Sequence, residues 1–407
     1  MADVLVLGAG MVGIGTALAL QSQGHQVRIL DRRGPGEETS HGNAGVIQSE
    51  ARVPYAMPRD PATLIRYAMG LSNDLRFSPG ALPGAAGALL AYYQHSGPAG
   101  LARVIPHYAE IISRATQDHG RLVSDAGADD LIRRTGLGEI FDTPADFDAG
   151  ARAAQENAAA HGLDLELMSG PDLRTAEPAL TATPAGAVVW NDSWSTSDPS
   201  ALALAYARLF VSHGGTLVRD DAADLARTST GWRLRGTQSS YTAEHVVIAL
   251  GPWSPAFLRP LGYRVPMVMK RGYHGHYSME GRLTRPYLLA QQGVVLSSMA
   301  RGLRITTGVH MTRANSPRNL AQLTRGAAAA GRWMKLNGPV ADSQWHGVRP
   351  CLPRMLPMVG KAPRHDGLWF NFGHGHQGFT LGPTTGALLA EIMDGRDDTL
   401  TRALSPG

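Results

Sequence analysis

The chain opens with an apolar run, a glycine-rich turn and a helical pattern. Residues 4–7 are all apolar, as in a buried parallel strand, and apolar positions then recur at helical spacing as far as Leu20. Gly24 predicts the end of this helix, and residues 27–30 are predicted to form a second buried strand that ends at Asp31. Strand, helix and strand in this order predict a βαβ unit with a parallel sheet.

Similar patterns return in two later parts of the sequence. A helix is predicted with Ser197 as its N-cap, Pro199 in its first turn and Gly214 just beyond its end. Strand patterns surround this helix, at residues 186–190, 216–219, 232–235, 241–242 and 245–250. Near the C-terminus, residues 368–372 form another apolar strand, and a helix begins at Phe379.

The remaining parts lack this alternation. Prolines interrupt the start of the segment 54–165, and amphipathic helices are predicted there over 103–126 and 147–161. The segment 257–345 alternates apolar and polar residues in short runs, which predicts an antiparallel sheet, followed by a helix over 318–337.

The predicted fold class is therefore α/β, with two domains. A discontinuous, Rossmann-like nucleotide-binding domain is expected from residues 1–53, 166–256 and 346–407. An α+β substrate-binding domain with an antiparallel sheet is expected from residues 54–165 and 257–345.

The first turn, Gly8-Ala9-Gly10-Met11-Val12-Gly13, predicts a dinucleotide site. In such a motif the first glycine permits a tight turn, the second lets the backbone approach a pyrophosphate, and the third lets the helix pack against the strand. The N–H groups at Met11 and Val12, where the helix starts, then face the phosphates. Asp31, with Arg32 beside it, lies where a carboxylate accepts hydrogen bonds from ribose hydroxyls.

A glycine-rich turn without a ligand is the alternative, because the sequence has 48 glycines. The strand before the turn, the helix after it and the acid at the second strand favour the dinucleotide site. The motif leaves NAD, NADP and FAD open, and Asp31 disfavours the 2′-phosphate of NADP.

Three further stretches are predicted to contact the same ligand. Ser40 precedes the small residues Gly42, Asn43, Ala44 and Gly45, which can lie flat against a bulky planar ligand; an ordinary surface loop is the alternative. Gly251 and Trp253 follow the strand 245–250, where the backbone can again approach a cofactor. The third stretch is a glycine–histidine loop over residues 373–378.

This last loop indicates which cofactor is bound. The helix that follows it can stabilise negative charge at its N-terminus. A reduced flavin carries such charge at its N1–C2 carbonyl edge, whereas a nicotinamide does not, so the loop favours a flavin.

Composition narrows the classes of function. The net charge of +4 comes mostly from scattered single arginines, so no nucleic-acid stripe is predicted. Cys351 is the only cysteine, which fits a reducing cytoplasm, and no signal peptide or apolar membrane span is recognised. Peripheral contact with a membrane stays open. His274 and His276 have no carboxylate or cysteine nearby, so no metal site is predicted.

These stretches together resemble a known family. The motifs GAGMVG with Asp31, SHGNAG, VVIALGPWS, GVRPCLPRMLPMVG and GHGHQGFTLGPTTG resemble those of the FAD-dependent D-amino-acid oxidase superfamily, and most of all its bacterial D-amino-acid dehydrogenases. The resemblance spans residues 4 to about 395. It implies a discontinuous FAD-binding domain beside an antiparallel substrate domain, tightly held FAD, and oxidation of a C–N bond next to a carboxylate.

The resemblance also implies roles for single residues. It places the substrate-carboxylate arginine at Arg349 and the adenine contact at the backbone of Val218. The flavin contacts that it implies are Gly42, Asn43, Ala44, Gly375, Gln377, Gly378, Phe379 and Thr380.

Two departures from the family pattern affect what is expected of the FAD linkage and of the substrate. Some relatives tether flavin through a cysteine at the position of Gly347 here, and Cys351 is displaced from it, so FAD is expected to be non-covalent. Glycine-oxidase-like members carry a second arginine where His376 stands, which leaves the side chain of the substrate open.

The leading hypothesis is oxidation of a D-amino acid, or a related amine-bearing acid, to the imino acid by hydride transfer to flavin N5. His374 or His376 would assist loss of the ammonium proton, and Tyr273 would face the substrate; the alternative is that both histidines only hydrogen-bond the loop. The electron acceptor stays open among O2, a quinone and a carrier protein.

Three other functions are kept. The first is an oxidase that uses O2 and acts on glycine, sarcosine or another N-substituted glycine. The second is an NAD-linked dehydrogenase, which the final loop does not support. The third is a nucleotide-binding module without turnover.

Overall fold

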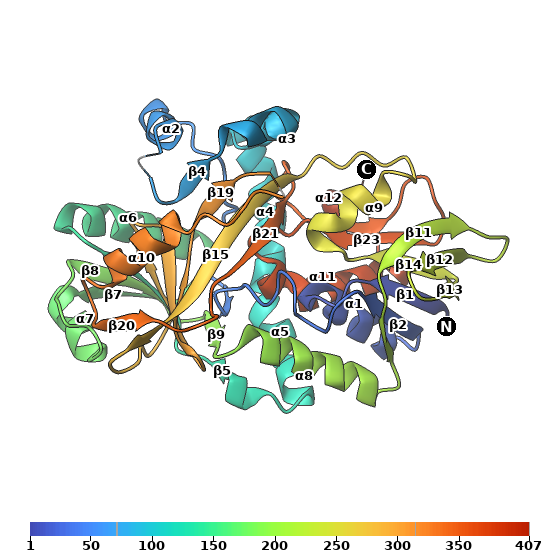
Figure 1. The fold of residues 1–407 in the computed structure, drawn as a ribbon, viewed down its shortest axis with the longest axis horizontal. Coiled ribbons are helices and arrows are strands. Elements are labelled where there is room, and N and C mark those ends of the chain that lie inside the picture. The colour runs from blue at the N-terminus through green and yellow to red at the C-terminus, as the bar shows by residue number, and fades with distance from the viewer. Residues whose placement is uncertain (71, 314, 407) are drawn as a thin grey trace.

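A computed structural model describes residues 1–70, 72–313 and 315–406. It contains two large sheets that lie side by side, with helices packed around and between them (Figure 1). The first and last parts of the sequence come together in one sheet, while the middle builds most of the other.

The nucleotide-side sheet is parallel except at one edge. Its strands, in spatial order, are β10 (Thr216–Arg219), β2 (Gln26–Asp31), β1 (Asp3–Leu7), β14 (His245–Ile248), β23 (Leu368–Phe372) and the antiparallel β22 (Met358–Lys361). The central strands β1, β14 and β23 are almost continuously apolar because both faces of the sheet are covered. The predicted Rossmann-like arrangement is confirmed.

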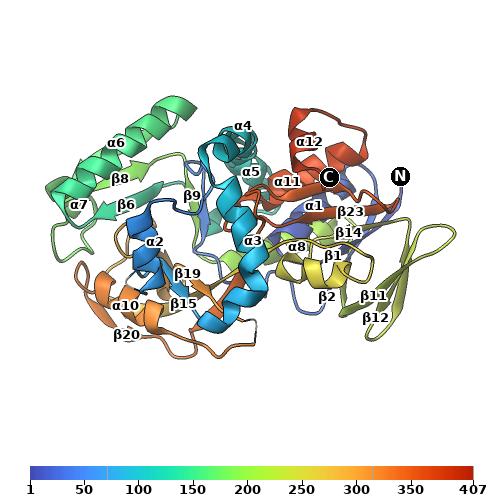
Figure 2. The same ribbon diagram turned by 90° about the horizontal axis from the view of Figure 1, so that it is seen from above.

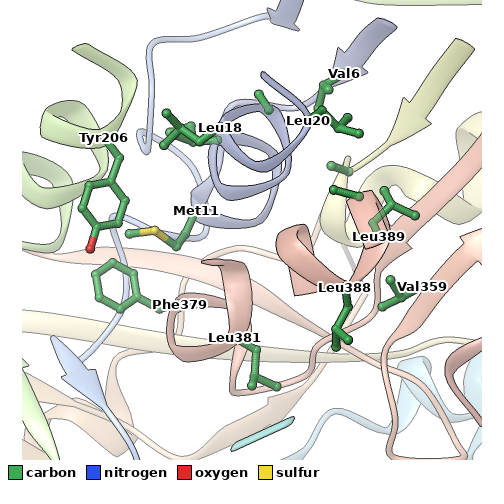
Figure 3. Close-up of a cluster of buried hydrophobic side chains, with 14 of the residues drawn as sticks. Val6, Met11, Leu18, Leu20, Tyr206, Val359, Phe379, Leu381, Leu388 and Leu389 are labelled. Carbon is green, nitrogen blue, oxygen red and sulfur yellow. The ribbon is translucent and has the colours of Figure 1, made fainter. Parts of the chain in front are cut away.

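One face of this sheet is covered by helices. Helices α1 (Met11–Ser22), α11 (Gly378–Met393) and α8 (Pro199–Ser212) lie on it, and α5 (Ala115–Asp125) and α4 (Pro98–Ser113) pack against α11. Their apolar side chains form one core with the sheet, in which Met11, Tyr206 and Phe379 lie around the start of α1 (Figure 3).

The other face packs against a ribbon of β11 (Ala222–Arg227), β12 (Trp232–Gly236) and β13 (Ser240–Ala243), with α9 (Ser254–Leu258) beside it. Trp232 and Leu234 of this ribbon are buried against the strands. The result is a three-layer domain with the glycine-rich loops at one end of the sheet.

Helices α1 and α11 approach each other at glycines. A Cβ on Gly386 would lie 2.5 Å from the carbonyl carbon of Gly15, and a Cβ on Gly15 would lie 2.7 Å from the carbonyl oxygen of Gly382. The two helices therefore pack backbone to backbone, which brings the first and last glycine loops of the sequence to the same place.

The larger sheet is mixed and mostly antiparallel. Its central path is β4 (Leu75–Phe77), β19 (Val309–Met311), β15 (Val268–Met279), β18 (Gly302–Thr306), β17 (Val294–Met299), β16 (Tyr287–Leu289), β6 (Leu137–Phe141), β8 (Gly186–Trp190) and β7 (Leu165–Ser169). Strands β20 (Leu336–Pro339) and β21 (Trp345–Cys351) pair with β15. The antiparallel pairs β15–β18, β17–β18 and β6–β8 confirm the predicted substrate-side sheet.

The remaining elements surround this sheet. A small sheet joins β3 (Val46–Ile47), β9 (Trp194–Thr196) and β5 (Ile132–Arg133). The helices are α2 (Pro61–Ala68), α3 (Leu82–His95), α6 (Pro144–His161), α7 (Gly170–Ala176), α10 (Ala321–Ala330) and α12 (Thr399–Leu404). Seen from above, α3 lies over the junction between the two sheets (Figure 2).

The structure corrects several predicted elements. The helix expected over 103–126 is two helices, α4 and α5, which are separated at Arg114. The helix expected over 318–337 covers only α10, because the chain becomes strand β20 from Leu336. Asp198, rather than Ser197, caps α8: its carboxylate accepts the N–H groups of Ser200 and Ala201.

The packing also differs from the predicted domain boundaries. Strands β7 and β8 pair within the larger sheet, although the sequence pattern predicts residues from 166 onward on the nucleotide side. Helices α4 and α5 pack against α11, although 54–165 is predicted on the substrate side. Both segments are apolar on the face that meets the other layer, and a pattern of apolar residues does not identify its partner.

Candidate functional site

One continuous cavity of about 770 Å³ runs along the ends of the nucleotide-side strands and across the face of the larger sheet. At one end it is lined by Gly8, Asp31 and Trp253, and at the other by Arg349 and Tyr273. The cavity therefore joins the first glycine turn to the region predicted to hold the substrate.

The nucleotide end is formed by the first turn of the chain. Gly8 has φ +110°, and a Cβ there would lie 2.5 Å from the carbonyl oxygen of Ala249, so only glycine fits. Helix α1 begins at Met11 without a side-chain cap for its first N–H groups, apart from the Met11 N–H, which donates to Ser40 Oγ at 3.0 Å. The N-terminus of α1 is thus open toward the cavity and favours an anion.

Asp31 closes this turn. Its Oδ2 accepts the N–H of Ala9 at 2.7 Å, and its Oδ1 accepts the N–H of Arg33 at 2.8 Å. Burial raises the pKa of Asp31, while these two backbone N–H groups partly offset the effect. The carboxylate therefore fixes the glycine turn and keeps lone pairs free for hydroxyl groups in the cavity. Next to it, the Arg32 guanidinium lies 4.3 Å from the centre of the Trp253 ring.

The final glycine loop lies at the middle of the cavity. Helix α11 begins at Gly378, and no side chain caps its N-terminus. His374 is buried, and its Nε2 forms a 2.9 Å hydrogen bond with Thr385 Oγ1. Burial lowers the pKa of His374 to about 3, so it is a neutral side chain that anchors the loop to α11.

His376 lines the cavity opposite Tyr55, with their ring centres 5.0 Å apart. Burial, together with the charges of Arg349 and Lys270, holds the pKa of His376 well below its usual range. The imidazole is therefore neutral at pH 7, and a base with so low a pKa is poorly matched to proton abstraction.

Arg349 lies on β21 with its guanidinium at the cavity wall. Its Nη1 donates to the carbonyl oxygen of Gly308 and its Nη2 to that of Thr307, both at 2.9 Å. Among the residues that the structure describes, no carboxylate lies within ion-pair distance of it. Two of its five N–H groups are thus used to fix its direction, and the positive charge is left without a counter-ion.

A second cation lies next to Arg349. Lys270 is its direct partner across the β15–β21 pair, and the Lys270 Nζ donates to the Tyr92 hydroxyl at 3.0 Å. Tyr92 in turn donates to the backbone carbonyl of Tyr55. Two adjacent positive charges make this end of the cavity suited to an anionic group.

Tyr273, on β15, lines the cavity near Arg349. Its hydroxyl forms a 2.8 Å hydrogen bond with His310 Nδ1, and its N–H donates to Thr307 Oγ1 at 3.0 Å. Tyr273 is thereby held in place by partners on neighbouring strands, so its ring acts as a fixed wall.

The structure brings most of the predicted site residues together. Those that line the cavity are Gly8, Gly10, Met11, Val12, Asp31, Arg32, Ser40, Gly42, Asn43, Ala44, Gly251, Trp253, Tyr273, Arg349, His374, Gly375, His376, Gly378 and Phe379. Those that lie behind or beside the lining are Gly13, Gly45, Val218, Gln377 and Thr380. Gly13 supports the turn from behind, since a Cβ there would lie 1.8 Å from the Gly8 carbonyl oxygen.

Several lining residues are not predicted by any sequence motif. The segment 220–223, just after β10, lines the cavity near the place expected for Val218. Gln48, Tyr55, Asp74 and Trp345 also line it. These residues come from unrelated points along the sequence, so only the strand pairing reveals them.

No metal site is found in the part of the protein that the structure describes. His274 and His276 instead belong to a cluster with His41, Trp345 and Arg304. Burial and the Arg304 charge lower the pKa of His274 to about 2 and that of His276 to about 4. The Arg304 guanidinium holds the loop before β3 by donating to the carbonyl oxygens of His41 and Asn43.

Residues 3–392 match the family described as FAD dependent oxidoreductase, DAO. The chain belongs to this family. It is 30% identical to a D-amino acid dehydrogenase of Cereibacter sphaeroides, over 97% of this sequence and 92% of the relative. It is also 28% identical to a D-amino-acid oxidase of Bradyrhizobium diazoefficiens, over 98% of this sequence and 97% of the relative.

The fold of this DAO-family protein is similar to that of glycine oxidase from Geobacillus kaustophilus. The two structures have a TM-score of 0.75 at 20% identity, and the match covers 100% of this protein and 98% of the glycine oxidase. This similarity confirms the fold. Within the described residues, no helix is both long and apolar enough to cross a membrane.

The cavity fits FAD, the cofactor of the family. The uncapped start of α1 and the Gly8–Gly10 turn would hold the pyrophosphate, and Asp31 would hold the ribose. The uncapped start of α11 would lie where the flavin ring carries negative charge when reduced. The enzyme is thus an FAD-dependent oxidoreductase, and both glycine loops line the cavity that would hold its cofactor.

Proposed function

We propose that this enzyme oxidises the C–N bond of a D-amino acid, or of a related amine-bearing carboxylic acid, to the imino acid. The observation that carries the proposal is Arg349, whose guanidinium lies at the cavity wall beside Lys270 and has no ion-pair partner among the described residues. The names of the Cereibacter and Bradyrhizobium relatives support it. FAD supplies the hydride acceptor for this chemistry.

In this proposal Arg349 binds the substrate carboxylate with two parallel hydrogen bonds. The carbonyl oxygens of residues 307 and 308 hold the guanidinium at a fixed angle, so that the substrate Cα–H is oriented. His376, being neutral, accepts a hydrogen bond from the amine without adding positive charge beside it. His374 positions the loop through Thr385.

We infer that FAD is held without a covalent bond. Gly347 stands near the Trp345 ring and offers no nucleophile, and the buried Cys351 has a pKa raised by burial. The His41 imidazole forms a hydrogen bond with Ser200 Oγ and packs against His274 and Trp345 instead of lining the cavity. Acid precipitation should therefore release FAD into the supernatant; flavin retained on the protein would contradict this inference.

We further propose a cytoplasmic location, with a peripheral membrane position open, because the single buried thiol fits a reducing compartment. The acceptor that reoxidises the flavin is O2, a quinone or a carrier protein. Steady-state rates in air, with and without an artificial acceptor dye, separate an oxidase from a dehydrogenase.

The test of the function is anaerobic bleaching of the flavin by a panel of D-amino acids, their L-isomers, glycine and sarcosine. Bleaching by D-amino acids is expected, and it needs no assumption about the acceptor. Bleaching by glycine or sarcosine alone would favour the N-substituted-glycine oxidase. A protein that binds no flavin would favour a module without turnover.

Arg349 is tested by substitution. Arg349→Ala should lower kcat/KM on the best acid substrate roughly a hundredfold, about 3 kcal/mol of transition-state stabilisation. Arg349→Lys keeps the positive charge but cannot donate two parallel hydrogen bonds to the carboxylate, so it should raise KM and lower kcat. FAD content should be normal in both. Arg152→Ala, which changes an exposed arginine on α6, is the control. Equal activity of Arg349→Ala and Arg152→Ala would show that Arg349 does not bind the substrate carboxylate.

A further inference from the structure

The cavity wall beyond Arg349 is an apolar strip on the face of the larger sheet. Leu288, Ala290 and Val295 line the cavity there, together with Leu137 of the neighbouring strand β6. Leu288 and Val295 are direct partners across β16–β17, so their side chains lie on the same face. The strip offers an aliphatic substrate arm a surface to lie on.

A carboxylate ends this strip. Asp74 lines the cavity. Its Oδ1 lies close to Gly293, and a Cβ added to Gly293 would be only 1.6 Å from this oxygen. Its Oδ2 accepts the Ser72 hydroxyl at 3.0 Å, and it forms no ion pair with any residue in the described ranges. Burial raises the pKa of Asp74, and the Ser72 bond and the charge of Arg66 only partly offset this.

A second acid flanks the strip on β6. Glu139 is paired with Leu288 across β16–β6 and lies two residues from Leu137, so it shares the face of these lining residues. Its carboxylate has no hydrogen-bond or ion-pair partner among the described residues. Burial and the nearby Glu50 raise its pKa to about 7. Glu139 is therefore only partly ionised at pH 7, and a cation bound beside it would favour its carboxylate form.

The α-amine of the substrate is a poor partner for these acids. Oxidation of an amine by hydride loss needs the neutral amine, whereas a carboxylate beside it would favour the ammonium form. A cation at the end of an aliphatic side chain has no such conflict. Long basic side chains place an apolar stem along apolar surface and a charged head at a polar group, which is the pattern of the strip and Asp74.

We propose that the substrate has a basic side chain, an ammonium or guanidinium group on an aliphatic arm, and that Asp74 binds this group. The assignment rests on the proposed function, because Arg349 must hold the other end of the same molecule. Glu139 acts as a positioning residue, because a cation at the strip favours its carboxylate form.

The first experiment uses the wild-type holoenzyme with D-arginine, D-lysine and D-norleucine, whose side chain is unbranched and uncharged. Anaerobic flavin reduction should give a kcat/KM at least tenfold higher for the better basic substrate than for D-norleucine. A preference for D-norleucine over both basic substrates would overturn the assignment of Asp74 while leaving the proposed function intact. Failure of every D-amino acid to reduce the flavin would instead overturn the proposed function.

The second experiment compares Asp74→Asn with Asp125→Asn, which removes a charge from an exposed site on α5. Asp74→Asn should lower kcat/KM for the basic substrate at least tenfold and change that for D-norleucine less than threefold. Equal losses on both substrates would overturn the assignment, because a structural role or contact with the α-amine predicts them. Glu139→Gln should give a smaller loss, also confined to the basic substrate, and it provides a second variant if Asp74→Asn fails to fold.

Discussion

The two ends of the cavity are built in different ways. The cofactor end consists of backbone: glycine turns and two helix N-termini that lie immediately after strands in the sequence. The substrate end consists of side chains from strands far apart in the sequence, such as Asp74 on the segment before β4 and Arg349 on β21. A backbone site depends on local sequence, whereas a side-chain site depends on which strands pair.

The difference extends to charge. At the cofactor end the Asp31 carboxylate is satisfied, since it accepts two backbone N–H groups. At the substrate end Arg349, Asp74 and Glu139 form no ion pair within the described residues. Charged groups left without counter-ions in a cavity are costly to the fold and available to a ligand, which is why we propose this end as the substrate site.

The largest effect is expected where α1 meets α11. Gly386→Ala places a methyl group 2.5 Å from the Gly15 backbone, so the helices must separate, and the free energy of unfolding should fall by about 3 kcal/mol or more. Urea denaturation of the holoenzyme measures this. Gly87→Ala on α3 meets nothing within 4 Å and should be neutral or stabilise by up to about 1 kcal/mol. Similar midpoints for both variants would contradict the close contact of α1 with α11.

The next effect belongs to the substrate end and depends on pH. The folded-state pKa of Glu139 is raised from 4.5 to about 7, so its stabilising contribution is complete below pH 4.5 and is lost as the pH rises through 7. The loss is up to about 3 kcal/mol, less what cavity water screens. Glu139→Gln should remove this part of the pH dependence. The free energy of unfolding of the variant should therefore increase relative to that of the wild type as the pH rises from about 5 to 8. Parallel stability curves would show that Glu139 is not desolvated.

A smaller effect is expected at the cofactor end. Asp31→Ala removes the acceptor for ribose hydroxyls and should weaken FAD binding by roughly 1.5–3 kcal/mol. It also leaves the N–H groups of Ala9 and Arg33 without their partner, so some loss of stability should accompany it. Asp31→Asn keeps one acceptor oxygen and should lie between the wild type and Asp31→Ala. FAD titration of the apoprotein measures the order, and unchanged affinity in both variants would show that the acid only shapes the turn.

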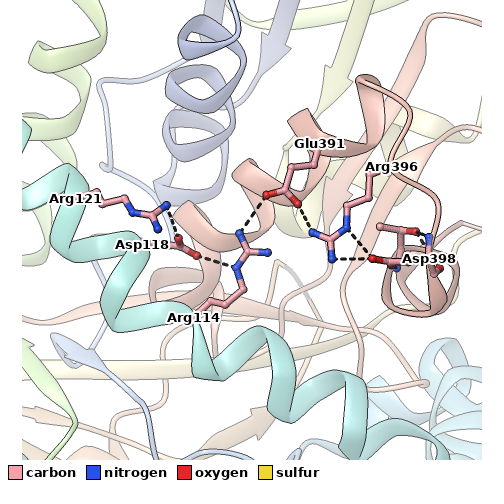
Figure 4. A network of polar contacts seen from close by, with 7 residues as sticks. Arg114, Asp118, Arg121, Glu391, Arg396 and Asp398 are labelled. Carbon is pink, nitrogen blue, oxygen red and sulfur yellow. Dashed lines mark hydrogen bonds and ion pairs between the residues drawn. The ribbon is translucent and has the colours of Figure 1, made fainter.

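The smallest effect is expected outside both ends, in the ion-pair network that joins α5 to α11 and α12 (Figure 4). Arg114 contacts Asp118 at 3.5 Å and Glu391 at 3.3 Å, and both Arg114 and Glu391 are partly exposed. Arg114→Ala should cost about 0.5 to 1 kcal/mol, and added salt should reduce the difference. A cost of several kcal/mol would mean that the network, rather than the apolar core that includes Ala115 and Val123, holds α5 in place.

Local sequence is enough to predict the cofactor end. Strand, glycine turn, helix and acid follow one another within residues 3–31, and their geometry is local, so the motif predicts both the fold and the ligand there. The final loop is predictable for the same reason, because β23, residues 373–377 and α11 are contiguous.

The substrate end, in contrast, depends on how distant strands pair. The apolar pattern identifies strands such as residues 186–190 but not their partners, so it does not reveal that β8 pairs with β6 in the larger sheet. The helix expected over 318–337 likewise ends before β20, a strand that forms by pairing with β15. Asp74, Tyr55 and Glu139 have no local signal, because what makes them part of a site is the pairing of β6, β16 and β19 with their neighbours. Arg349 is found through the family resemblance, and its unpaired charge becomes visible only when the surrounding strands are in place.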